Sequence, residues 1–212
     1  MIQVKCFTFN PFQENTYIIF DESKECIVID PGCYNENENK IIESFIENQN
    51  LKPVLLVNTH CHLDHVFGNQ FISMCYNLLP LIHRLDIPMM EYAAIAAKKY
   101  GIHLSKLPKI GGFIEEGDFV SFGKSSFKVV FSPGHSPGHI CLINDKQNIA
   151  ICGDVIFNLS IGRTDLPMGN HDDLIKSIRN KLFVLDNNTV IYPGHGPKTT
   201  IGFEKKNNPF IQ

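Results

Sequence analysis

The densest chemical feature of the chain is a turn that carries four donor side chains within six residues. The turn reads Thr59-His60-Cys61-His62-Leu63-Asp64-His65, and its donors are His60, His62, Asp64 and His65. An apolar run at 54–57, introduced by Pro53, predicts a strand that ends directly before this turn. Reactive side chains are often held by loops at the ends of rigid strands. The chain must therefore fold so that a buried strand delivers this turn to a site.

Three further predicted strands end in turns of the same kind. Their apolar runs lie at 127–131, 149–152 and 189–192, and the turns that follow carry His135, Asp154 and His195. The run at 189–192 is the last strand that the sequence predicts. Four strand ends that all carry His or Asp are not expected by chance in a structural protein. We expect the four turns to converge on one site.

The remaining segments complete an α/β pattern. Further strands are predicted at 3–9, 16–20, 26–29 and 140–143, and helices at 40–47, 66–76, 86–100 and after a capping Asn170. Residues 34–39 are expected to form a polar loop that leads into the helix at 40–47. Met89 and Met90 are expected to pack in the core rather than in a lid over a ligand. Strands followed by helices in each half predict two sheets with helices outside them, and without a Pro, Gly or Ser-rich linker we expect one domain over 1–212.

The composition narrows the class of protein. Lys and Arg total 19 against 22 Asp and Glu, a formal net charge of -3, so we expect no nucleic-acid partner. No run is apolar enough to span a bilayer and the first residues lack the pattern of a secretory signal, so we expect a cytoplasmic protein with no membrane partner. The seven cysteines show no CxxC spacing and are expected to be buried free thiols. The sequence indicates no oligomeric state.

The donors at the four strand ends suit divalent metal ions. Zinc in proteins takes roughly four ligands, among them neutral imidazoles and carboxylates. Five histidines and two aspartates can serve two ions if one carboxylate bridges them, and these are His60, His62, Asp64, His65, His135, Asp154 and His195. A single histidine is more often structural, but four donors in one turn outweigh that interpretation. Zinc is favoured, with iron and manganese as alternatives.

Neighbouring residues have roles that the pattern leaves open. We expect His139 to hydrogen-bond close to the metals rather than to ligate one. Asp30 either orients a ligand imidazole from behind or is a turn residue before Pro31-Gly32. Cys61 is expected to point into the fold. The remaining histidines fit no spacing pattern and are expected to be structural or exposed: His83, His103 and His171.

These residues resemble the metallo-β-lactamase superfamily. The resemblance lies in the His60 to His65 turn followed by Gly134-His135, Gly153-Asp154 and Gly194-His195. Three further segments resemble its glyoxalase II, or hydroxyacylglutathione hydrolase, branch: 153–157, 162–165 and 192–197. The tail, at 199–204 and 208–210, is similar to a short single-domain form of that branch.

The resemblance implies a four-layer αββα sandwich with a binuclear metal site at one edge of the sheets. It also implies how the ligands divide between the two ions. One ion would be held by His60, His62 and His135, the other by Asp64, His65 and His195, with Asp154 as the bridge. Long glyoxalase II enzymes add a C-terminal helical domain that contributes basic residues for glutathione. Since the chain ends 17 residues after His195, we expect that domain to be absent, and the role of glutathione stays open.

A binuclear site of this kind predicts hydrolysis of a carbonyl substrate. A metal-bound hydroxide, with Asp64 and Asp154 beside it, would attack the carbonyl carbon. A small thioester suits the site better than an amide or lactam, because a thiol with a pKa near 8.5 leaves without a proton donor. Arg163 either contacts a substrate carboxylate or pairs with Asp165, and we favour the pairing.

Other functions are compatible with parts of this pattern. Persulfide dioxygenases share the fold and a Gly-Arg-Thr-Asp segment like that at 162–165, but use a single iron held by two His and one Asp. A nucleic-acid-processing member of the superfamily would need a basic surface. A metal-binding protein without catalysis would not need the complete ligand set. We therefore predict a thioester hydrolase and keep the mononuclear-iron dioxygenase as the alternative.

Overall fold

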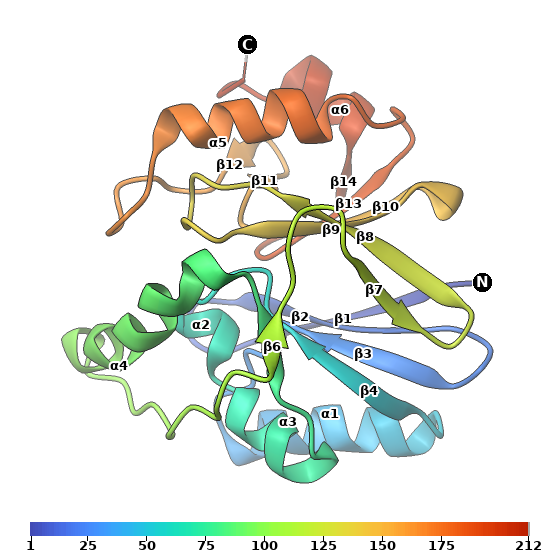
Figure 1. Cartoon of the computed structure of the whole chain (residues 1–212), viewed down its shortest axis with the longest axis vertical. Coiled ribbons are helices and arrows are strands. Elements are labelled where there is room, and N and C mark those ends of the chain that lie inside the picture. The colour runs from blue at the N-terminus through green and yellow to red at the C-terminus, as the bar shows by residue number, and fades with distance from the viewer. Residues whose placement is uncertain (212) are drawn as a thin grey trace.

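The computed structural model describes residues 1–211, in which two six-stranded sheets face each other (Figure 1). Sheet A contains, in spatial order, β1 (Gln3–Phe9), β2 (Glu14–Phe20), β3 (Glu25–Ile29), β4 (Lys52–Val57), β5 (Pro80–Ile82) and β6 (Gly112–Phe113). Sheet B contains β14 (Thr199–Thr200), β13 (Val190–Pro193), β10 (Ile149–Gly153), β9 (Ile140–Asn144), β8 (Ser125–Phe131) and β7 (Phe119–Phe122). Each sheet mixes antiparallel hairpins with parallel pairs, β3 with β4 and β10 with β13 among them.

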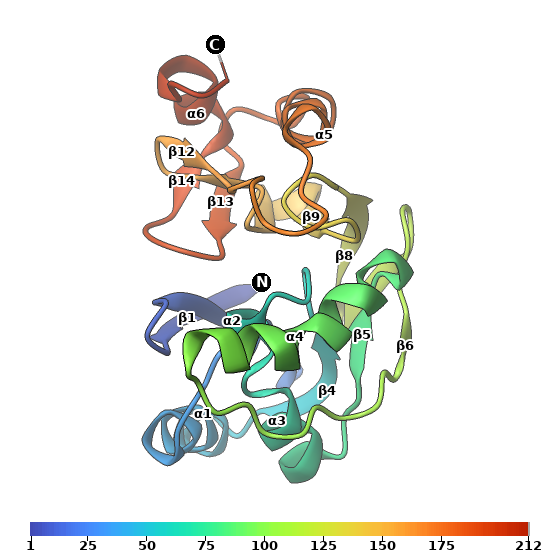
Figure 2. The same cartoon turned by 90° about the vertical axis from the view of Figure 1, so that its left-hand side faces the viewer.

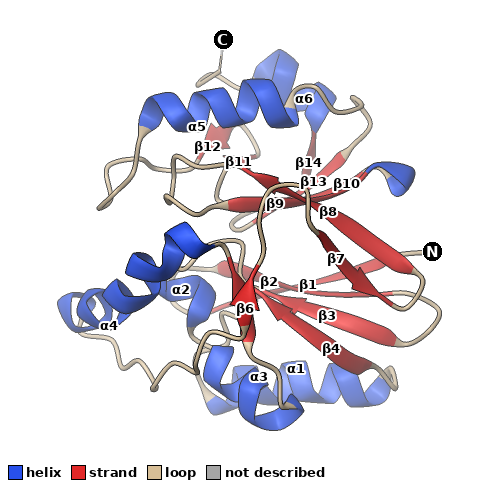
Figure 3. Ribbon diagram, viewed as in Figure 1, coloured by secondary structure: helices blue, strands red, loops and turns tan. Residues whose placement is uncertain are grey.

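Helices cover the outer face of each sheet (Figure 3). Sheet A is covered by α1 (Glu36–Asn48) and α3 (Asn69–Tyr76), and sheet B by α5 (His171–Ser177), its π-helical continuation Ile178–Leu182, and α6 (Ile201–Asn207). The short α2 (Leu63–Val66) and the longer α4 (Ile87–Tyr100) lie at one edge of the sandwich, which Figure 2 faces. Short elements complete the chain: the 3-10 turns Arg84–Asp86 and Asp145–Gln147, and the hairpin of β11 (Ile156–Phe157) and β12 (Ser160–Ile161). The predicted αββα sandwich is confirmed.

The core follows from alternation along the strands. In β3, Ile27 and Ile29 face sheet B, whereas Cys26 and Val28 face the helices outside sheet A. In β9, Leu142 packs between the sheets, and its neighbours on the strand pack under α5. Because side chains alternate between the two faces, a strand covered on both sides must be apolar throughout. This explains why these strands read as continuous apolar runs in the sequence.

The carboxyl ends of several strands lie at the edge occupied by α4. The ends of β3 and β4 are adjacent because these strands pair in parallel, with Ile29 opposite Val57. The ends of β10 and β13 are adjacent for the same reason. Clefts beyond the carboxyl ends of strands are the usual binding position in open α/β sheets. The sandwich thus brings the predicted turns of both halves together.

Two predictions in the first half of the chain need correction. The helix predicted at 66–76 is interrupted at Gly68, whose N–H donates to the Pro31 carbonyl at 2.7 Å. A Cβ at Gly68 would stand 2.3 Å from Cys33 Sγ, so a close backbone approach breaks the helix there. The polar loop at 34–39 is instead mostly the first turn of α1, because Asn35 Oδ1 caps the helix by accepting from the N–H groups of residues 37 and 38.

Two further features bear on the sequence predictions. The strand predicted at 189–192 is not the last one, since β14 and α6 follow it, and Thr200 caps α6 by accepting from the Phe203 N–H. All seven cysteines are free, and Cys6 and Cys75 are exposed rather than buried. Among the helices of residues 1–211, none combines the length and apolarity that a membrane crossing requires.

Candidate metal centre

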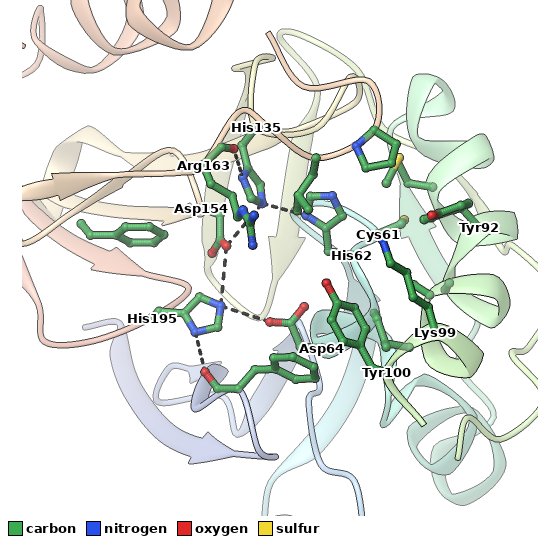
Figure 4. A pocket seen from close by; sticks show the side chains of 18 of the residues that line it. Cys61, His62, Asp64, Tyr92, Lys99, Tyr100, His135, Asp154, Arg163 and His195 are labelled. Carbon is green, nitrogen blue, oxygen red and sulfur yellow. Dashed lines mark hydrogen bonds and ion pairs between the residues drawn. The ribbon is translucent and has the colours of Figure 1, made fainter. Parts of the chain in front are cut away.

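The seven predicted ligands meet at the edge of the sandwich. Figure 4 shows the five of them that line a cavity there, which are His62, Asp64, His135, Asp154 and His195. The turn after β4 carries His60 and His62, and α2 carries Asp64 and His65. The loops after β8, β10 and β13 carry the other three. Donor atoms lie within 4.8 Å of one another in each of two groups, which are His60, His62 and His135, and Asp64, His65 and His195. These are the two groups that the family resemblance implies.

Asp154 lies between the two groups. Its Oδ2 is 3.4 Å from His135 Nε2, and its Oδ1 is 3.4 Å from His65 Nε2. The same carboxylate reaches His195, with Oδ2 3.6 Å from Nε2, while Asp64 Oδ2 is 3.2 Å from that nitrogen. A carboxylate that contacts a member of each group is placed to bridge two ions.

The other ring nitrogen of four histidines is held by an acceptor. His135 Nδ1 donates to the Arg163 carbonyl at 2.8 Å, and His195 Nδ1 donates to the Phe12 carbonyl at 3.1 Å. His65 Nδ1 is 3.1 Å from Asp30 Oδ2, and His60 Nδ1 is 3.1 Å from the hydroxyl of Thr59. Such contacts fix the tautomer with the proton on Nδ1, so the lone pair of Nε2 faces the centre.

Several buried side-chain nitrogen and oxygen atoms have no hydrogen-bond partner within residues 1–211. Four of them belong to predicted ligands: His60 Nε2, His62 Nε2, His65 Nε2 and Asp154 Oδ1. Buried polar atoms are almost always paired, so this concentration requires an explanation. Imidazole and carboxylate donors that converge without partners fit divalent cations.

The charge states of four of the donors suit the same interpretation. Two histidines differ, because neighbouring carboxylates raise the pKa of His65 and of His195 despite burial. Burial lowers the pKa of His60 and of His135, and lowers that of His62 to about 3, so these rings are neutral. Burial alone would raise the pKa of Asp154, but the surrounding histidines, His65 foremost, hold it well below its usual range. Neutral imidazoles and ionised carboxylates are the forms that bind metals.

Asp30 lies behind the ligands rather than among them. Its Oδ1 accepts from the Thr59 N–H at 2.6 Å, and its Oδ2 accepts from the Thr59 hydroxyl at 2.5 Å and faces His65. Asp30, His60 and His65 also form a group of donor atoms within 4.8 Å. Since the Asp30 oxygens already have these partners, we interpret the residue as the one that orients both histidines.

His139 holds the backbone of the bridging residue. Its Nε2 accepts from the Asp154 N–H at 3.0 Å, and its ring stacks on His60 with centroids 4.7 Å apart. His139 is therefore not in either ligand group. Gly194 completes the packing here, because a Cβ at this position would stand 2.0 Å from Asp154 Oδ1.

The sequence patterns missed Asp86, a buried carboxylate that joins two ligand loops. Its Oδ2 accepts from the Cys61 N–H at 2.6 Å, and its Oδ1 accepts from the Gly138 N–H at 2.7 Å and from the Ser136 hydroxyl. Cys61 lies in neither donor group, and it packs in a core cluster that also contains Met89. The only sequence signal for Asp86 was its position as the first residue of the helix predicted at 86–100.

A cavity of about 380 Å³ opens beside the donor groups. The helix α4 lines it through residues 89–100, and Phe157, Ile161 and Leu166 also line it. Met89 is buried in the core as predicted and also lines this cavity. Arg163 lines the cavity (Figure 4), and its guanidinium pairs with Asp165 through two hydrogen bonds of 2.8 and 2.7 Å. The three histidines outside the pattern lie in neither donor group; His83 stacks on Phe131 and the other two are exposed.

The sequence pattern of the metallo-β-lactamase superfamily matches residues 9–195 of the chain. The protein belongs to this superfamily. Its His and Asp clusters accordingly imply divalent metal ions, and its membership and relatives imply a hydrolase.

Several superfamily members are similar to the protein over its whole length. The hydroxyacylglutathione hydrolase GloC of Haemophilus influenzae is 36% identical, and the match covers 99% of this chain and 98% of GloC. The crystal structure of BLEG-1, a B3 metallo-β-lactamase, superposes with a TM-score of 0.91 at 30% identity, covering 99% and 100% of the two chains. The structure of TTHA1623 in a di-iron-bound form has a TM-score of 0.87 at 36% identity, covering 98% and 100%.

Proposed function

We propose that the protein is a metal-dependent thioester hydrolase of the hydroxyacylglutathione hydrolase type. The proposal rests on the makeup of the cavity: among the described residues that line it, every Asp, Glu or His belongs to the predicted ligand set. Full-length similarity to GloC supports the same activity. The substrate must therefore be one whose leaving group departs without a carboxyl or imidazole acid.

Different residues would have different roles in thioester hydrolysis. The chemistry that bound divalent ions supply is a water of lowered pKa and a polarised carbonyl. Asp64, in one donor group, and Asp154, between the two groups, present ionised carboxylates that would hold the attacking water by accepting its hydrogen bonds. The apolar wall of α4 and Phe157 limit the access of other water. Water adds to the carbonyl carbon, the carbon–sulfur bond breaks, and the products are a carboxylic acid and a thiol.

The leaving group explains why a thioester suits this cavity. A thiol has a pKa near 8.5 and departs as thiolate at neutral pH, whereas an amine leaving from an amide or lactam needs a proton. Similarity to BLEG-1 makes a lactam the second substrate to test. Two complete donor groups joined by Asp154 are also more than a single iron with two His and one Asp would need.

A panel of substrates tests the proposal on protein of measured metal content. We expect hydrolysis of S-lactoylglutathione, little hydrolysis of a chromogenic cephalosporin, and no oxygen uptake on glutathione persulfide. Zinc, iron and manganese forms should be compared, because ligand type alone does not select among them. Turnover of no thioester, or one iron per chain with oxygen uptake, would contradict the proposal.

Two variants test whether activity depends on the predicted ligands themselves or only on nearby charge. Asp154→Ala should lower thioester turnover by roughly a hundredfold or more, because it removes the carboxylate that contacts both donor groups and would hold the attacking water. Asp165→Ala is the control, since Asp165 is exposed in the same region and touches no predicted ligand. If Asp154→Ala kept full activity, the assignment of the site would be wrong.

A further inference from the structure

Two cations line the cavity outside the predicted ligands, and they differ in their partners. Arg163 is engaged by Asp165 in a two-bond pair. Lys99 makes no hydrogen bond or ion pair to another residue within 1–211. The carboxylates that line the cavity are Asp64 and Asp154, which lie in the ligand set. Lys99 is therefore the cation that the cavity leaves available for a ligand.

The geometry of α4 explains how Lys99 reaches the cavity. The helix lines it with Met89, Ala93 and Ala96 and, one turn further, with Lys99. Positions three and four residues apart share one face of a helix, so these residues form a continuous wall. Figure 4 shows Lys99 and Tyr100 side by side on the cavity wall, on the side of α4. Lys98 and Lys99 are both exposed, but only Lys99 lines the cavity.

The end of α4 is fixed relative to the metal centre. The Tyr100 ring packs edge-on against Phe12, with centroids 5.7 Å apart. The Phe12 carbonyl in turn accepts from His195 Nδ1. The residue next to Lys99 is thus tied to the loop that orients a predicted ligand, which fixes the helix end from which the exposed Lys99 side chain extends.

Stabilisation of the helix does not explain the position of Lys99. Cations in the last turn of a helix interact favourably with its dipole. Lys98 and Lys99 both lie in that turn and both supply this interaction. Only Lys99 also faces the cavity, so its placement calls for a second explanation.

We propose that Lys99 binds a carboxylate in the thiol portion of the substrate. This inference rests on the proposed thioesterase function. The reacting carbonyl must lie at the donor groups, and Ala93 and Ala96 line the same cavity on the face of α4 that carries Lys99. The longer half of the thioester lies along Ala93 and Ala96, and its anionic end reaches Lys99.

Substrate charge provides the test by turnover. Lys99→Gln should raise KM for S-lactoylglutathione by about tenfold, the effect of losing one hydrogen bond to a charged group, with kcat little changed. It should leave KM for the lactoyl thioester of uncharged N-acetylcysteamine unchanged. Lys99→Arg should keep most of the affinity, and Lys98→Gln should behave as wild type. An equal effect of Lys99→Gln on both thioesters, or an equal effect of Lys98→Gln, would overturn the assignment.

Equilibrium binding separates this inference from the proposed function. S-Methylglutathione keeps the carboxylates of glutathione but has no thioester bond, so its affinity measured by calorimetry does not depend on catalysis. We expect binding to the wild type that weakens about tenfold in Lys99→Gln and not in Lys98→Gln. Binding that depends on Lys99, without turnover of any thioester, would contradict the proposed function but not this inference. Thioester turnover in which neither KM nor the binding of S-methylglutathione changes in Lys99→Gln would contradict this inference but not the proposed function.

Discussion

At the residue scale, Asp30 orients two predicted ligands, His65 directly and His60 through Thr59. The backbone of Asp30 has a φ of 47°, a region that Asp and Asn tolerate better than most side chains. This conformation follows β3 directly and lets one carboxylate reach Thr59 and His65 together. The Thr59 hydroxyl, held by Asp30, in turn contacts His60 Nδ1 and so fixes the orientation of that ring.

Asp30→Asn should weaken metal binding about 10- to 100-fold, the usual cost of losing a partner behind a ligand histidine. The amide still tolerates the backbone angle and can accept from the Thr59 N–H, but its NH₂ group cannot accept from His65 Nδ1. Competition with a chelator measures the change.

Asp21→Asn is the matched control for that experiment. Asp21 is a buried aspartate at the far end of β2, where it contacts no predicted ligand. It should leave metal affinity unchanged. Equal affinities of the Asp30 variant and the wild type would show that Asp30 is only a turn residue.

At the element scale, Asp86 connects the start of α4 to two ligand loops. It accepts from Cys61, between two predicted ligands, and from Ser136 and Gly138, between His135 and His139. One carboxylate therefore fixes the spacing of the β4 and β8 loops and the helix that lines the cavity.

Asp86→Ala should destabilise the protein by about 3 kcal/mol or more, because it leaves three buried donors without an acceptor. Urea unfolding measures this loss, and metal content should fall in parallel because both ligand loops loosen. Asp145→Ala, an exposed aspartate in a 3-10 turn, should change neither quantity. A stability loss under 1 kcal/mol for Asp86→Ala would contradict this role.

At the scale of the whole molecule, Asp21 joins the two sheets at the end opposite the site. It follows β2, and its Oδ2 accepts from the Lys124 N–H in the turn before β8 and from the hydroxyl of Ser125, the first residue of β8, both at 2.8 Å. Burial alone would raise its pKa, but these bonds and those from Ser23 outweigh it and lower the pKa to about 2.

The stability that Asp21 contributes should depend on pH. A pKa that is lower in the folded state means that the contribution is complete above the unfolded value of 3.8 and is lost as the pH falls towards 2. Asp21→Asn should therefore cost about 1–2 kcal/mol at pH 6 and little near pH 2. Urea unfolding of both proteins across this range measures the difference, and a difference that does not vary with pH would contradict the assignment.

The sequence predicted the layers and the donor side chains because both leave local signals. Apolar runs mark the strands, and His or Asp directly after them mark the site. Contacts between distant segments left no such signal. Asp86 meets Cys61 across 25 residues and the Phe12 carbonyl meets His195 across 183, and Lys99 gains a role only where α4 crosses the cavity. The break at Gly68 likewise depends on Cys33, a neighbour in space only.

The most direct test of the two-metal thioesterase is a titration of metal-free protein with zinc, followed by S-lactoylglutathione turnover at each step. Two donor groups bridged by Asp154 predict two tightly bound ions per chain, with turnover reaching its plateau as the second ion binds. A plateau at a single ion, or the absence of thioester hydrolysis with both sites filled, would contradict the account.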